Sequence, residues 1–218
     1  YGKPTSDQWF MAGAGNVTGS ATKNIGIGNA ALLSFTTGIN NVAIGYHAGR
    51  LIQGGQGNVA IGTEALKTNV SGNNNFALGT EALKVSTASN NVAVGGLSQP
   101  ATSTGEKNVS LGYFTLNANT TGFENVAIGN VAMQLNVDGY RNIAIGSEAL
   151  LSNSAGYGNI GFGQGALYSS TGDRNIVIGY QSGASLTSGS RNILVGSSIT
   201  FPSNTGSNQM TIGNIIYA

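Results

Sequence analysis

The chain has 218 residues, of which 40% are hydrophobic and 8% are charged, and nine Lys and Arg residues balance eight Asp and Glu residues. A nucleic-acid-binding protein of this size is expected to carry a basic stripe, which this balance does not supply, so we expect no nucleic-acid partner. The sequence has no Cys, which excludes disulfides, zinc–thiolate sites and thiol catalysis, and it has no apolar run near the roughly 18 residues of a membrane span, so we expect no membrane insertion by this segment.

Residues 1–23 precede the regular part of the sequence. Trp9, Phe10 and Met11 form a bulky apolar cluster there, which includes the chain's one Trp. Such a cluster is expected to cover the open edge of the structure that follows, because an uncovered sheet edge invites strand addition. The alternative is a docking surface for a preceding segment or a ligand. We therefore predict an N-terminal cap or junction over residues 1–23.

One phrase recurs from residue 24 to residue 213: Asn, a large apolar residue, a small residue, a second large apolar residue, and Gly. Successive copies begin 16 or 17 residues apart, and we number each repeat from its Asn as position 1. The twelfth copy begins at Gln209 in place of Asn. The eleven motif Asn residues are Asn24, Asn41, Asn58, Asn75, Asn91, Asn108, Asn125, Asn142, Asn159, Asn175 and Asn192.

The short alternation of apolar and small residues has the period of a strand. A repeat of about 17 residues is too short for two helices with their turns, whereas two short strands joined by two Gly-assisted corners fit. We therefore predict an all-β fold over residues 24–213: a parallel β-roll or β-solenoid of about 12 coils. Identical positions stack in such a fold, so the Asn side chains are expected to form a structural ladder that hydrogen-bonds from coil to coil. A ligand-binding row is the alternative role for these Asn residues.

Positions 2, 4 and 9 supply three dependable large apolar residues per coil, which is a thin filling for a domain that stands alone. We expect positions 2 and 4 to point into the coil and the small residue at position 3 to point out, where it would let another backbone approach. The opposite facing, with Val and Ile outward in an interface and Ala inward, remains open. Both arrangements predict that the chain packs against copies of itself.

The phrases Asn-Asn-Val-Ala-Ile-Gly at 40–45, Asn-Val-Ala-Ile-Gly at 58–62 and 125–129, and Asn-Ile-Ala-Ile-Gly at 142–146 resemble the head repeats of YadA-like trimeric autotransporter adhesins. Similar arrays occur in bacteriophage tail fibres and other bacterial surface fibres. The resemblance implies a left-handed roll, a homotrimer, and an extracellular place on a bacterial surface or a virion tail fibre. The repeat here is longer than the usual head repeat of that family.

The C-terminal stretch from Gln209 to Ala218 looks like the end of a phage-type fibre shaft that precedes a removable trimerisation chaperone. We therefore expect residues 214–218 to be the C-terminal end of the shaft.

Phe123, Tyr140 and Tyr157 occupy position 16 in three consecutive coils and are expected to form an aromatic ladder. Aromatic rows can stack sugar rings, so this ladder is the candidate glycan-binding site. Stacking for stability alone would give the same pattern.

Three titratable residues at position 7 are candidates for a catalytic or a metal site. Glu64 and Glu81 share position 7 in adjacent coils, with a spacing like that of a retaining glycosidase pair. Lys67 and Lys84 lie three residues after them, so a solvated charged face is the preferred interpretation. His47 has no second His or Cys to share a metal, and we predict no catalytic or metal-binding residue.

Together these features favour a non-enzymatic structural or adhesive fibre segment that needs no cofactor. Its expected partners are two further copies of itself, adjoining fibre segments and a cell-surface glycan or receptor. Several copies of one weak surface would bind by avidity. Two alternatives remain open: a tailspike-like glycan depolymerase, and a passive shaft whose binding tip lies elsewhere.

Overall fold

The structure, a computed structural model, describes residues 9–11, 13 and 21–213. The chain divides into two compact units, one up to Lys107 and one from Asn108, and each is described by itself. The predicted end of the shaft at 214–218 lies outside the described residues, and so do the side chains of Trp9, Phe10 and Met11.

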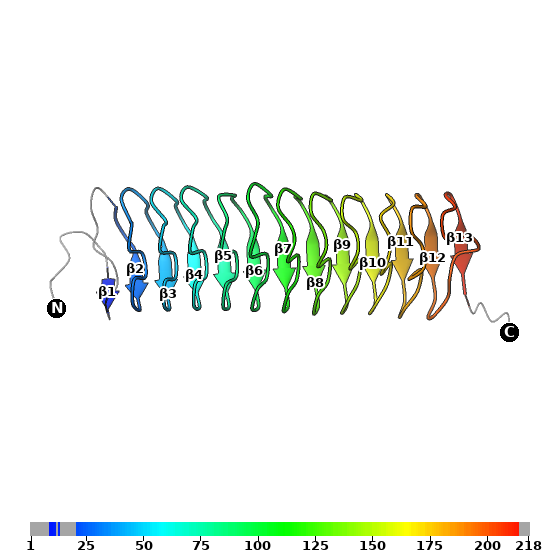
Figure 1. Ribbon diagram of the computed structural model, residues 1–218, viewed down its shortest axis with the longest axis horizontal. Helices are drawn as coiled ribbons and strands as arrows, with labels where there is room; N and C mark the ends of the chain where they lie inside the picture. The colour runs from blue at the N-terminus through cyan, green and yellow to red at the C-terminus, as the bar shows by residue number, and fades with distance from the viewer. Residues whose placement is uncertain (1–8, 12, 14–20, 214–218) are drawn as a thin grey trace. The chain divides into compact units, whose positions relative to one another are not determined.

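Every repeat contributes one strand of three residues, formed by positions 2 to 4 of the sequence phrase (Figure 1). The first unit contains β1 (Trp9–Met11), β2 (Ile25–Ile27), β3 (Val42–Ile44), β4 (Val59–Ile61), β5 (Phe76–Leu78) and β6 (Val92–Val94). The second unit contains β7 (Val109–Leu111), β8 (Val126–Ile128), β9 (Ile143–Ile145), β10 (Ile160–Phe162), β11 (Ile176–Ile178), β12 (Ile193–Val195) and β13 (Met210–Ile212).

Consecutive strands of each unit pair in parallel, position for position, as in the pairing of Ala43 with Ala60 and of Ala127 with Ala144. The register follows the repeat, including the repeats of 16 residues, where Phe76 pairs with Val92. These pairings confirm an all-β, parallel β-solenoid with a repeat of about 17 residues. β1 pairs with β2 in the same way, Trp9 opposite Ile25, although the sequence phrase is absent before residue 24.

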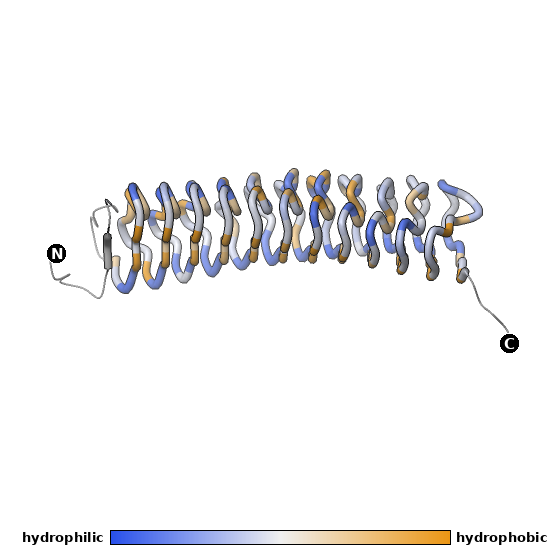
Figure 2. Tube along the Cα trace, turned by 90° about the horizontal axis from the view of Figure 1, so that it is seen from below, coloured by the Kyte–Doolittle hydropathy of each residue, from blue (hydrophilic) through white to orange (hydrophobic). Residues whose placement is uncertain are grey.

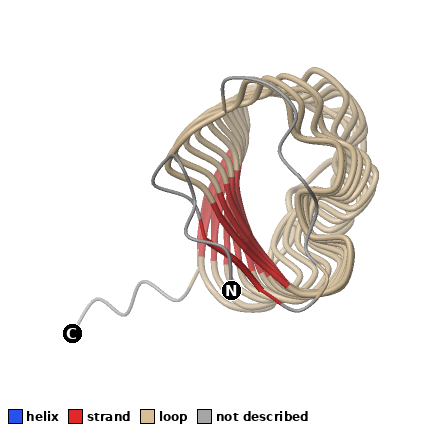
Figure 3. Cartoon of the chain, turned by 90° about the vertical axis from the view of Figure 1, so that its left-hand side faces the viewer, coloured by secondary structure: helices blue, strands red, loops and turns tan. Residues whose placement is uncertain are grey.

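The second half of each coil differs from the prediction, because it forms stacked turns where a second strand was expected (Figure 3). Glu64 at position 7 and Leu66 at position 9 both have left-handed backbone angles, with φ of 57° and 47°. Their coil still bonds to its neighbour, since the N–H of Leu66 donates to the carbonyl of Ala82 at 3.0 Å. The prediction of two strands per coil was therefore wrong: hydrogen-bonded turns replace the second strand.

The preferred orientation of the strand side chains, with positions 2 and 4 inside the coil and position 3 outside, was also wrong. Ala43, Ala60, Ala127 and Ala144 at position 3 are fully buried inside the coil, while positions 2 and 4 point outward. The coil is narrow, so Leu side chains at position 9 of the opposite wall fill the space in front of position 3. A methyl group added to Gly161, which stands at position 3, would lie 3.3 Å from Cγ of Leu150. Apolar and polar positions consequently recur in columns from coil to coil (Figure 2).

Candidate functional site

The outward sheet surface is apolar in both units. We call the side chains at positions 2 and 4 of β2–β13 the strand face, and none of these strands contains a charged residue. Members that are at least 37% exposed are Ile25, Phe76, Leu78, Ile143, Phe162, Ile178, Ile193, Val195, Met210 and Ile212. Monomeric soluble proteins rarely expose contiguous apolar surface of this kind, so the strand face is a candidate interaction surface.

The motif Asn residues line a buried corner of the coil and bond to one another. Asn58 donates its side-chain amide to Oδ1 of Asn41 at 3.0 Å and to the carbonyl of Gly72 at 2.8 Å. Its own Oδ1 accepts from both the backbone N–H and the side-chain amide of Asn75, at 3.0 and 3.1 Å. Because Asn58 is also fully buried, none of its polar groups is open to a ligand.

A second buried Asn column lies at position 12 and was missed by the sequence analysis. Asn136 donates to Oδ1 of Asn119 at 2.8 Å, and Asn153 donates to Oδ1 of Asn136 at 3.1 Å. Asn136 also donates to the carbonyl of Gly139, which accepts a bond from Asn125 of the first ladder. The signal was present at the same 17-residue spacing, but Phe, Ile, Leu, Ser and Thr interrupt the column in other coils.

The predicted aromatic ladder forms, with its rings nearly parallel. The ring centroids of Phe123 and Tyr140 are 4.8 Å apart, and those of Tyr140 and Tyr157 are 5.0 Å apart. The guanidinium of Arg174 lies 5.1 Å from the ring centroid of Tyr157, and Arg141 is ion-paired with Glu124 at 2.8 Å beside the ladder. Neighbouring rings therefore cover both faces of Tyr140, and the ladder presents ring edges, hydroxyl groups and guanidinium groups to solvent.

Glu64 is the centre of a charged network in the first unit. Its carboxylate lies 2.7 Å from Nζ of Lys67 and 2.9 Å from Nζ of Lys84 of the next coil, which also pairs with Glu81 at 3.2 Å. These hydrogen bonds from Lys67 and Lys84 lower the pKa of Glu64 to about 2. A glycosidase general acid needs the opposite shift, so this environment suits a permanently ionised structural carboxylate.

His47 lies at the end of this network. Its Nδ1 is 3.8 Å from the carboxylate of Glu64, and its ring stacks on Tyr46 with centroids 3.8 Å apart. Over the described ranges, no group of three or more His, Cys, Asp or Glu side chains is placed to hold a metal ion.

Comparisons of the chain with protein-family models, with curated proteins and with solved structures found no match. Within residues 9–11, 13 and 21–213, no helix has the length and apolar character that crossing a membrane requires.

Proposed function

We propose that this chain is a structural and adhesive segment of an extracellular homotrimeric fibre, on a bacterial surface or a virion tail. The observation that carries the proposal is the strand face: an uncharged sheet surface of Val, Ile, Leu and Phe that recurs in every coil and is left uncovered in a single chain.

The occupant of the strand face is another copy of the same chain. Its side chains recur with the coil spacing within each unit, so the corresponding units of identical copies can meet coil by coil. Closed symmetric assemblies of identical chains are the commonest soluble oligomers. The number three and the extracellular place follow from the resemblance of the repeats at 58–62, 125–129 and 142–146 to trimeric adhesin heads.

A charged substitution on the strand face tests this assembly. Ile143 is 37% exposed in β9, and Ile143→Glu is expected to convert the trimer to a monomer because three carboxylates would be buried in the interface. Leu135→Glu is the matched control, since Leu135 is 47% exposed but belongs to the turns that form the second half of each coil, which we call the turn wall. Sedimentation measures the mass, and far-UV circular dichroism verifies that both variants are folded. A trimer that survives Ile143→Glu contradicts the proposed interface.

Measuring the binding of the native protein to whole cells and to immobilised glycans distinguishes an adhesive segment from a passive shaft. An adhesive segment should bind far more strongly as the multivalent assembly than as a single chain, because linked weak sites act by avidity. Incubation with the same glycans also tests the depolymerase alternative: new reducing ends that disappear in Glu64→Gln or Glu81→Gln would replace the adhesive assignment.

A further inference from the structure

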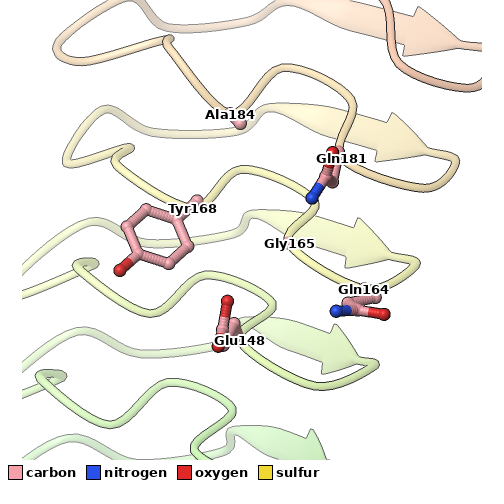
Figure 4. Close-up of a pocket in the computed structure, with 6 residues that line it drawn as sticks. All are labelled: Glu148, Gln164, Gly165, Tyr168, Gln181 and Ala184. Atoms are coloured by element: carbon pink, nitrogen blue, oxygen red, sulfur yellow. The ribbon is translucent and has the colours of Figure 1, made fainter.

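The second unit carries a hollow on its turn wall that the sequence analysis did not find. Its volume is about 380 Å³, and three consecutive coils line it. Figure 4 shows the six lining residues, which are Glu148, Gln164, Gly165, Tyr168, Gln181 and Ala184. The volume lies at the small end of the range found for small-molecule sites.

The hollow exists because two adjacent coils each have a small residue where a neighbouring coil has a large side chain. Position 7 carries a long side chain in the neighbouring coils, Glu148 and Gln181, but is Gly165 between them. Position 10 carries Tyr168 in that coil and only Ala184 in the next. In the first unit the same two columns are filled by the paired side chains of Glu64 and Lys67.

Glu148 supplies a carboxylate that forms no ion pair with any described residue. Glu64, Glu81 and Glu124 each have a Lys or Arg partner, whereas Glu148 has Leu151 where the first two have a Lys three residues on. Among the described residues, no basic side chain lies within ion-pair distance of Glu148. One of its oxygens points into the space between Tyr168 and Gly165 (Figure 4).

We infer that this hollow is a binding site for an uncharged hexopyranose, the terminal or internal unit of a surface glycan. Tyr168, 37% exposed, provides the ring against which the apolar face of a sugar packs. Glu148 accepts hydrogen bonds from adjacent hydroxyl groups, and the amides of Gln164 and Gln181 both donate and accept them. Glu148 is the one charged lining residue, so its carboxylate repels uronic and sialic acids.

This inference rests on the proposed adhesive function for its biological meaning, and it names the site and the sugar class through which that function acts. Each chain carries this hollow once, so a trimer would present three copies of it, and a weak individual site would gain strength from avidity.

The sharpest test refills the hollow with the side chain that its neighbours carry. Gly165 has φ of 64°, close to the 60° of Glu148 and the 47° of Gln181. A Cβ on Gly165 would meet Cγ of Gln181 at 3.6 Å, an ordinary contact. Gly165→Gln places a side chain at a positive φ, a strained conformation that Glu148 and Gln181 already adopt in the neighbouring coils, so the variant is expected to fold and to block the site. Tyr168→Leu removes the ring, and Tyr113→Leu is its control, because Tyr113 is a 55% exposed Tyr outside the hollow.

Saturation-transfer NMR is run on the native protein with methyl glucoside, methyl galactoside, N-acetylglucosamine and glucuronic acid. We expect transfer to at least one of the three neutral sugars and none to glucuronic acid. Gly165→Gln and Tyr168→Leu should weaken that binding by about tenfold or more, and Tyr113→Leu should leave it unchanged. Glu148→Gln should reduce the preference for neutral sugars over glucuronic acid.

Absence of transfer to all three neutral sugars, or transfer that survives Gly165→Gln, overturns the inference. Failure of the proposed function looks different. A native protein that sediments as a monomer and binds no cells contradicts the fibre, whereas a trimer that binds cells equally well with Gly165→Gln contradicts only this hollow.

Discussion

The backbone N–H and the side-chain amide of Asn142 both donate to the side-chain oxygen of Asn125, at 3.0 and 3.1 Å. The same pair of hydrogen bonds recurs elsewhere in the ladder, as from Asn58 to Asn41, and joins the corners of neighbouring coils. The ladder holds the register at the place where the chain enters its strand.

Removing one member of the ladder should therefore be costly. Asn125→Ala leaves two buried donors of Asn142 without their acceptor, and we expect the free energy of unfolding to fall by about 2–4 kcal/mol. Urea denaturation measures the change. Asn130→Ala is the control, because Asn130 is an exposed Asn of the same coil, and it should change stability by less than about 0.5 kcal/mol. Equal losses in the two variants would show that the ladder is not stabilising.

The register, the coil and the first Asn ladder were predictable because each depends only on which residues recur at the same spacing. Which side chains of each strand point into the coil was not predictable. An alternation of Ala with Val or Ile defines two faces of the strand but does not show which face is inside. The answer depends on the opposite wall, where Leu66 and Leu150 at position 9 are fully buried and leave room only for a methyl group.

The turns of the second half of each coil could not be predicted from the sequence for a different reason. Their left-handed residues, among them Glu64, Leu66 and Glu148, are not Gly, so the usual signal for such a conformation was missing. The hollow beside Tyr168 was missed as well, because it arises from side chains that are absent at Gly165 and Ala184 rather than from a motif.

The observed facing makes a prediction within a single strand. Ala127 of β8 is fully buried, so Ala127→Leu should overpack the interior and lower the free energy of unfolding by about 1–3 kcal/mol or more. Val126→Leu, at the adjacent half-exposed position, should have a much smaller effect on thermal unfolding. The opposite ranking would contradict an interior built from the Ala column.

Both short coils have a Ser at position 12, the column in which Asn119, Asn136 and Asn153 bond to one another. The hydroxyl of Ser170 is buried and has no hydrogen-bond partner among the described residues. Ser170→Ala should therefore leave stability unchanged or raise it by up to about 1 kcal/mol, because a buried unpaired polar group is removed. Asn136→Ala, in the bonded part of the same column, should lower it. A clear loss of stability in Ser170→Ala would mean that the hydroxyl is paired in solution.

The Glu64 network predicts a dependence of stability on pH. The pKa of Glu64 is about 2 in the folded chain, below its ordinary value of 4.5, because Lys67 and Lys84 donate hydrogen bonds to it. The contribution is therefore fully present above about pH 4.5 and is lost as the pH falls toward 2. Since these side chains are partly exposed, we expect on the order of 1 kcal/mol, reduced by salt.

Thermal unfolding of the native protein and of Glu64→Gln between pH 6 and 2 checks this dependence. The difference between the two should shrink as the pH falls through this window. A constant difference would show that Glu64 is not held ionised by its lysines.

The central claim is that the strand face joins identical chains, and light scattering on the native protein as it elutes from a sizing column tests it most directly. We predict a mass near three times the chain mass of 22.0 kDa, independent of dilution over the measured range. A mass of 22.0 kDa would mean that the Val and Ile rows are exposed in solution, and it would contradict the assignment as a trimeric fibre segment.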